Sequence, residues 1–147
     1  MPLVPHDNSN WRRGVGDVTV TFTDEGKRIL DLEASEASLT LRYANGPLLV
    51  ALPPEVFNNF QPGRLPDGVE DEDHLRCDEL PTPLAIFSDC SDARVEGWPS
   101  MQGHAAAWAW QVSSGGRAIA LAPHPEYAQA EQSRQLFRKL LLWCLNS

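Results

Sequence analysis

A histidine and a glutamate lie two positions apart, His124 and Glu126, directly after the apolar run 117–123. Pro123 and Pro125 restrict the backbone on both sides of the histidine, so they limit where its imidazole points. An imidazole held by a carboxylate forms the base and the orienting group of a triad whose nucleophile is a cysteine or serine. The same pattern is also typical of a stiff turn in which a glutamate stabilises a helix N-terminus.

The residues around this pair predict a strand before it and a helix after it. The run 117–123 is apolar without polar alternation, which is typical of a central strand covered on both faces. From residue 127 to residue 145, apolar residues recur every three or four positions and predict an amphipathic helix. We therefore expect His124 at the carboxyl end of a strand, where the sites of open α/β sheets lie.

The upstream sequence contains further strand-like segments. Residues 24–32 predict a turn and a short helix, although Gly26 weakens that prediction. Residues 104–112 are compatible with a strand or a short helix, and the flanking glycines favour the strand. Strands are predicted in this way for 17–23, 38–43, 84–89 and 104–112, and a further apolar run covers 48–52.

Residues 53–83 differ from the rest, because they contain six prolines and an acidic cluster. We expect a long exposed excursion here, within a single domain that spans 14–147, and a loose N-terminal segment over 1–13. The acidic cluster lacks the spacing of a calcium-binding loop, and His74 and Cys77 have no second pair of ligands nearby. No metal and no other cofactor is therefore predicted.

Composition excludes several classes of partner. The formal net charge of the 147 residues is -8, which disfavours nucleic acid and anionic membrane surfaces. No apolar stretch is long enough for a transmembrane helix, and the N-terminal residues do not resemble a signal peptide. Three cysteines without a regular spacing are typical of reduced thiols, so we expect a cytoplasmic protein.

Three segments resemble a known family in the same order: "WRRGVGDVTVTFTDEGKRIL", "LRYANGPLL" and "GGRAIALAPHPE". They are similar to class I glutamine amidotransferase-like domains, in particular to proteins related to the N-terminal domain of biotin-protein ligases. The resemblance covers the chain from Trp11 to its end and is weakest over 53–83. It implies an α/β, partial flavodoxin-like layered sheet, mixed or parallel, with a last central strand at 117–122 and a C-terminal helix.

The resemblance also implies roles for individual residues. His124 matches the base of the family's Cys-His-Glu triad, and Glu126 matches the carboxylate that orients it. Four residues of the "YxNGP" segment would shape a loop that faces the site: Tyr43, Asn45, Gly46 and Pro47. The activity implied is amide hydrolysis through a thioester.

The sequence departs from the family at the nucleophile. No G-x-C-x-G or G-x-S-x-G occurs in it, and the family's nucleophile elbow would lie upstream of the "YxNGP" segment. The sequence therefore resembles the C-terminal portion of such a domain, which we do not expect to catalyse the reaction alone. Cys90 follows the predicted strand 84–89 but has no glycine neighbours, and Asp89 and Asp92 would raise its thiol pKa.

Three functions remain compatible with these residues. The chain is a split or degenerate amidotransferase-like protein, a non-enzymatic binding or interaction module, or a hydrolase with Cys90 as a relocated nucleophile. Cys77 in the acidic cluster and Cys144 in the predicted helix are expected to have no catalytic role. The expected partner is a complementary N-terminal half or a second copy that pairs through an exposed sheet edge.

Overall fold

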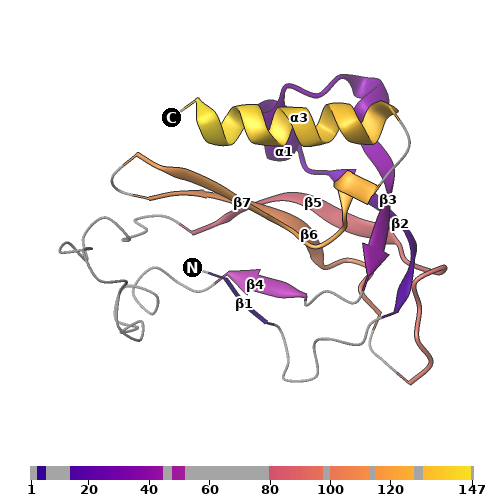
Figure 1. The fold of residues 1–147 in the computed structure, drawn as a ribbon. Helices are drawn as coiled ribbons and strands as arrows, with labels where there is room; N and C mark the ends of the chain where they lie inside the picture. The colour runs from indigo at the N-terminus through magenta and orange to yellow at the C-terminus, as the bar shows by residue number, and fades with distance from the viewer. Residues whose placement is uncertain are drawn as a thin grey trace.

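The computed structural model describes residues 3–5, 14–44, 48–51, 80–97, 100–112, 115–127 and 131–146. These residues form an α/β fold with a strongly curled sheet and a C-terminal helix (Figure 1). In chain order the strands are β1 (Leu3–Pro5), β2 (Val15–Phe22), β3 (Ser38–Ala44), β4 (Leu49–Ala51), β5 (Thr82–Asp89), β6 (Ala105–Gln111) and β7 (Arg117–Leu121). The helices are α1 (Asp24–Leu30) and α3 (Glu131–Leu145), with short 3-10 turns η1 (Ala34–Glu36) and η3 (Pro125–Tyr127).

Five strands form the main sheet in the order β3-β2-β5-β6-β7, and every neighbouring pair is antiparallel. The expectation of a mixed or parallel sheet is therefore wrong for the described residues. The expectation that the last strand is central is also wrong, because β7 lies at the edge of this sheet. Its apolar character has another cause, since α3 packs on it and brings Ile119 and Leu121 against the core.

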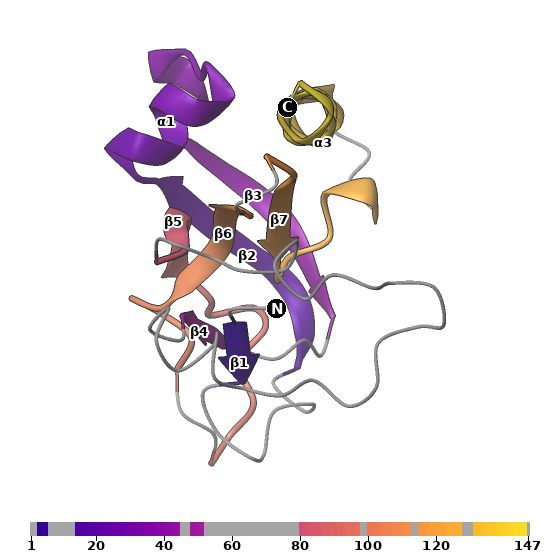
Figure 2. The ribbon, with the colours of Figure 1, turned by 90° about the vertical axis from the view of Figure 1, so that its left-hand side faces the viewer.

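Both helices lie on one face of the sheet, with α1 over β5 and α3 over β7 and β3 (Figures 1 and 2). A separate two-stranded sheet of β1 and β4 lies on the other side, where the Trp108 indole donates a hydrogen bond to the Leu49 carbonyl at 3.2 Å. Sequence reasoning predicts no strand in residues 1–13, whereas Leu3–Pro5 pairs with β4. Three residues are too few to show a periodic pattern.

The alternating residues of β2 and β3 divide cleanly between core and solvent. Val18, Val20 and Phe22 of β2 are buried, as are the leucines of β3 and Tyr43. On the outer face, polar residues face one another across the two strands. They form the pairs Asp17–Arg42, Thr19–Thr40 and Thr21–Ser38.

The curled sheet brings its two outer strands together at one end. The backbone N–H of His124, just beyond β7, donates to the carbonyl of Arg42 in β3 at 2.6 Å and forms an isolated antiparallel bridge. Farther along, α3 spans the space between β7 and β3 and buries Leu136 and Leu140 there. Lys139 anchors α3 through hydrogen bonds to the Asp31 carbonyl and the Glu36 carboxylate. The sheet is thereby closed by one backbone bond and one helix.

The first turn of α1 lies directly on the backbone of β5. Thr23 caps the helix by accepting a hydrogen bond from the Gly26 N–H, and its own N–H donates to the Leu84 carbonyl. A Cβ at position 26 would lie 2.0 Å from that carbonyl oxygen. Gly26, which weakens the helix prediction from propensity alone, is therefore required by the close approach of helix and strand.

Other boundaries differ from the predictions by a few residues. The C-terminal helix begins at Glu131 rather than at residue 127, because η3 occupies Pro125–Tyr127. Thr82 and Pro83, expected in the excursion 53–83, belong to β5. The rest of that excursion up to residue 79 lies outside the described residues.

We expect the substitution Gly26→Ala to lower the free energy of unfolding by about 1–3 kcal/mol, because its methyl group forces α1 away from β5. Urea denaturation followed by circular dichroism measures this loss. Gly116→Ala is the matched control, since its Cβ would meet only a Val112 methyl group at 3.2 Å. Equal losses in the two variants would contradict the role assigned to Gly26.

Candidate active site

His124 is positioned by the backbone on both sides of it. β7 ends at Leu121, and the His124 N–H is bound to the Arg42 carbonyl. Pro123 and Pro125, which flank the histidine, are both buried. The neighbouring strands alternate in direction, so β3, β5 and β7 point the same way and their carboxyl ends lie at one end of the sheet. His124 thus lies at a strand end, as predicted.

The structure brings His124 and Glu126 together. Nδ1 of the imidazole lies 2.8 Å from Oε1 of the carboxylate, within hydrogen-bond distance. Both side chains are partly open to solvent, with 32% of the histidine and 44% of the glutamate side chain exposed. When Nδ1 carries the proton and donates it to the carboxylate, Nε2 is the unprotonated, basic nitrogen. This is the arrangement of a general base with its orienting group.

The electrostatics of the pair favour an ionised carboxylate. Burial raises the pKa of Glu126, but hydrogen bonds from His124 and from its own backbone N–H outweigh this effect, so the pKa lies below its ordinary value. An ionised Glu126 stabilises positive charge on the imidazole when Nε2 takes up a proton. The pair is therefore arranged as a base with an ionised orienting carboxylate.

The pair lies at one end of a mostly apolar pocket of about 320 Å³. One wall is β7, and the other is the face of α3 that carries Phe137, Leu141 and Cys144. Sequence reasoning assigns these α3 residues to an amphipathic stripe but does not place them beside His124. Their spacing of three and four residues is the only local signal, and it does not identify the facing strand.

Tyr43 is completely buried and packs edge-on against Phe87, with ring centroids 5.9 Å apart. It is a core residue that fixes the end of β3, next to the Arg42 carbonyl that holds His124. Asn45, Gly46 and Pro47, the rest of the predicted loop-shaping segment, lie outside the described residues.

Cys90 lies directly after β5, at the same end of the sheet as His124. β6 runs between β5 and β7, which separates the two strand backbones by about 10 Å. The Cys90 side chain is buried, and burial, together with the charge of Asp89, raises the pKa of its thiol to about 11. A thiol of this kind is almost entirely protonated at neutral pH and is a poor nucleophile.

Cys144 lines the same pocket as His124 but its thiol is also unfavourably placed for chemistry. Burial raises its pKa, against the opposing effects of the Ile119 backbone N–H and the positive charge of Arg117. Its position between α3 and β7 agrees with a packing role.

Within the described ranges, no three histidine, cysteine, aspartate or glutamate side chains gather in a way that could hold a metal ion. His74 and Cys77 lie outside those ranges. Neither described α-helix combines the length and apolar character needed to cross a bilayer.

In comparisons with known proteins, no family model, no curated protein and no solved structure matches the chain.

We expect Glu126→Gln to lower the stability of the fold at neutral pH more than at acidic pH. Because the folded-state pKa of Glu126 is depressed, its stabilising effect is present above the ordinary value of 4.5 and is lost as the pH falls through the folded-state pKa. Urea denaturation at a series of pH values measures the gap between the variant and the wild type. The difference in the free energy of unfolding between the variant and the wild type should narrow below pH 4.5. A constant gap, or one matched by Glu96→Gln in the exposed loop after β5, would contradict the pairing.

We expect the Cys90 thiol to react slowly with iodoacetamide in the native protein. With a pKa of about 11, only about one thiol in ten thousand is ionised at pH 7. Alkylation followed by peptide mass spectrometry measures the rate, and the same peptide in urea is the control. A native rate equal to or faster than the rate in urea would show an activated thiol.

Proposed function

We propose that His124 and Glu126 are the general base and the orienting carboxylate of a class I glutamine amidotransferase-like domain. The observation that carries the proposal is the 2.8 Å contact between Nδ1 of His124 and Oε1 of Glu126. The location of the pair at a strand end, held by the Arg42 carbonyl, supports it. The resemblance of "GRAIALAPHPE" to the family's final strand and loop supports it as well.

In this proposal, Nε2 of His124 accepts the proton of a cysteine thiol, and Glu126 accepts the hydrogen bond of Nδ1–H. The thiolate attacks the carbonyl carbon of an amide. The imidazolium then donates its proton to the departing nitrogen, and ammonia and a thioester result. Water, deprotonated by the same imidazole, cleaves the thioester and regenerates the thiol.

The nucleophile of this scheme lies outside the 147 residues, because they contain no glycine-flanked cysteine or serine elbow. Residues 14–147 are then the C-terminal portion of a flavodoxin-like layered domain. The parallel strands of that fold belong to the complementary portion that also carries the nucleophile. The expected partner is a complementary segment, and a second copy bound at a sheet edge is the alternative. These residues alone hold a base without a nucleophile, so they are not a competent amidase.

A binding function is the second candidate, and the pocket beside His124 favours it. Its volume of about 320 Å³ and its apolar walls suit a small ligand whose polar group meets the histidine. In a binding module, His124→Ala weakens binding without changing any reaction. The third candidate, a hydrolase that uses Cys90, is disfavoured by the burial and the raised pKa of that thiol.

The proposal is tested with the coding DNA upstream of codon 1. We expect it to encode a segment with a G-x-C-x-G or G-x-S-x-G elbow, and co-expression of that segment with this chain to give a complex that releases ammonia from glutamine. His124→Ala should lower the rate about 100-fold or more, because the general base is lost. Its backbone N–H is retained, so the bond to Arg42 should remain.

Two results would overturn the proposal. One is the lack of any elbow-encoding segment upstream, and the other is ammonia release that persists in His124→Ala. Arg138→Ala, at an exposed position on α3, is the matched control and should leave the rate unchanged. Binding of a small ligand by the chain alone, with no activity in the complex, would instead favour the binding module.

A further inference from the structure

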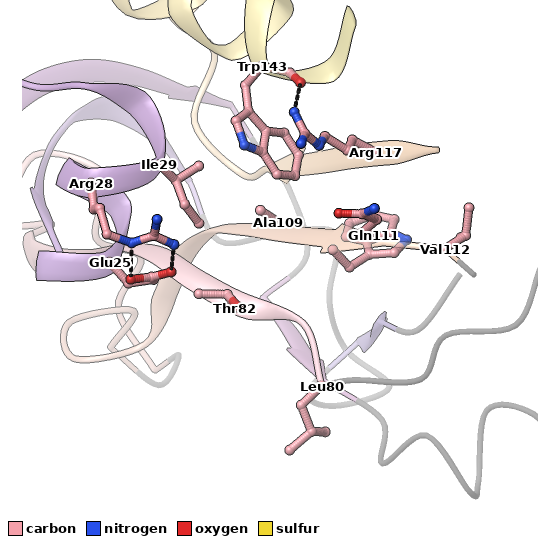
Figure 3. A pocket seen from close by; sticks show the side chains of 11 residues that line it. Glu25, Arg28, Ile29, Leu80, Thr82, Ala109, Gln111, Val112, Arg117 and Trp143 are labelled. Carbon is pink, nitrogen blue, oxygen red and sulfur yellow. Dashed lines mark hydrogen bonds and ion pairs between the residues drawn. The ribbon is translucent and has the colours of Figure 1, made fainter. Parts of the chain in front are cut away.

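A second pocket, of about 630 Å³, lies between α1 and the C-terminal end of α3 (Figure 3). Its floor is formed by β5 and β6, with Thr82, Ala109 and Gln111 facing it (Figure 3). It shares no lining residue with the pocket beside His124. Its volume falls within the range of about 300–1,000 Å³ that is typical of small-molecule sites.

The two side walls of this pocket differ in charge. On the α1 side, Arg28 and Glu25 are hydrogen-bonded to each other through both carboxylate oxygens, so their charges are balanced. On the α3 side, the guanidinium of Arg117 lies over the Trp143 ring, 5.2 Å from its centroid. Figure 3 shows the two walls facing each other across β6.

The hydrogen-bond donors of the Arg117 guanidinium are only partly paired. Its Nη1 donates to the carbonyls of Asn146 at 2.7 Å and Trp143 at 3.4 Å, which end α3. Its Nε is buried and has no hydrogen-bond partner among the residues that the structure describes. An unpaired buried donor is costly and calls for an explanation, such as a ligand that completes the site.

Arg117 also lacks a counter-ion within the described part of the chain. Two other partly buried basic side chains, Lys27 and Lys139, are paired with carboxylates at 3.0 Å and 2.8 Å. Arg117 pairs only with carbonyls, although the whole chain has an excess of eight negative charges. The described residues therefore provide no carboxylate that neutralises the positive charge of Arg117 in this pocket.

We infer that this pocket binds a small molecule that carries one carboxylate on an apolar body. The carboxylate pairs with the guanidinium of Arg117, of which Nη1 binds the last carbonyls of α3. The apolar body lies against Trp143, Ile29 and Leu80, which line the pocket. The net charge of -8 disfavours a dianion such as phosphate.

Benzoate is the probe, and benzamide, of the same shape without the charge, is its matched control. Nuclear magnetic resonance of ¹⁵N-labelled protein detects the Nε–H signal of Arg117 directly. We expect benzoate to shift this signal saturably and to slow its exchange with water, whereas benzamide does neither.

The variant Arg117→Lys keeps the positive charge but removes the planar fork, and we expect it to weaken benzoate binding about tenfold, as for one lost charge-assisted hydrogen bond. Arg138→Lys, exposed on α3, should bind as the wild type does. Circular dichroism confirms that each variant is folded. The inference is overturned if benzoate and benzamide act alike, if phosphate competes with benzoate at equal concentration, or if Arg117→Lys binds benzoate unchanged.

Discussion

The hydrogen bond between the His124 N–H and the Arg42 carbonyl, together with α3, closes the main sheet. It joins β7 and β3, which are the two outer strands of the main sheet and would otherwise diverge. Once these strands are joined, the sheet must curl, and one face becomes concave enough for α3 to span it. The same bond fixes the backbone from which the His124 imidazole projects. Fold and candidate site therefore depend on one contact.

Each pocket occurs where α3 and the sheet do not fill the space between them. Near His124, the apolar stripe of α3 meets the edge of β7 and leaves the smaller pocket with the His124–Glu126 pair at its end. At the other end of α3, Arg117 binds the last carbonyls of the helix and borders the larger pocket. The helix therefore contributes different faces to two chemically distinct surfaces.

The sequence predicts those features whose causes are local. β2 and β3 show alternating residues, and both form strands close to the predicted ranges 17–23 and 38–43, with alternate residues buried. The contact between His124 and Glu126 follows from their two-residue spacing across Pro125. The antiparallel pairing and the edge position of β7 could not be predicted, because they depend on which distant backbone groups meet. An apolar run looks the same in a central strand and in an edge strand beneath a helix.

Arg117 and Gly26 illustrate two further limits of local reasoning. Helix propensity counts Gly26 as unfavourable, but the decisive factor is the Leu84 carbonyl, which is far away in the sequence. The position of Arg117 at the start of an apolar run gives no indication that its guanidinium will meet the end of α3. Both residues are explained only by contacts that the folded chain creates.

Closure of the sheet between residues 42 and 124 also affects how the chain folds during synthesis. β3 leaves the ribosome early, but the backbone group that covers its outer edge belongs to a residue made much later. For that interval the carbonyls of β3 are open to strands of other nascent chains, which is a route to aggregation. The polar outer face of β2 and β3 limits this hazard, since a stray strand would gain little apolar contact there. The late bridge thus makes closure a slow, non-local step that follows the pairing of β2 with β3.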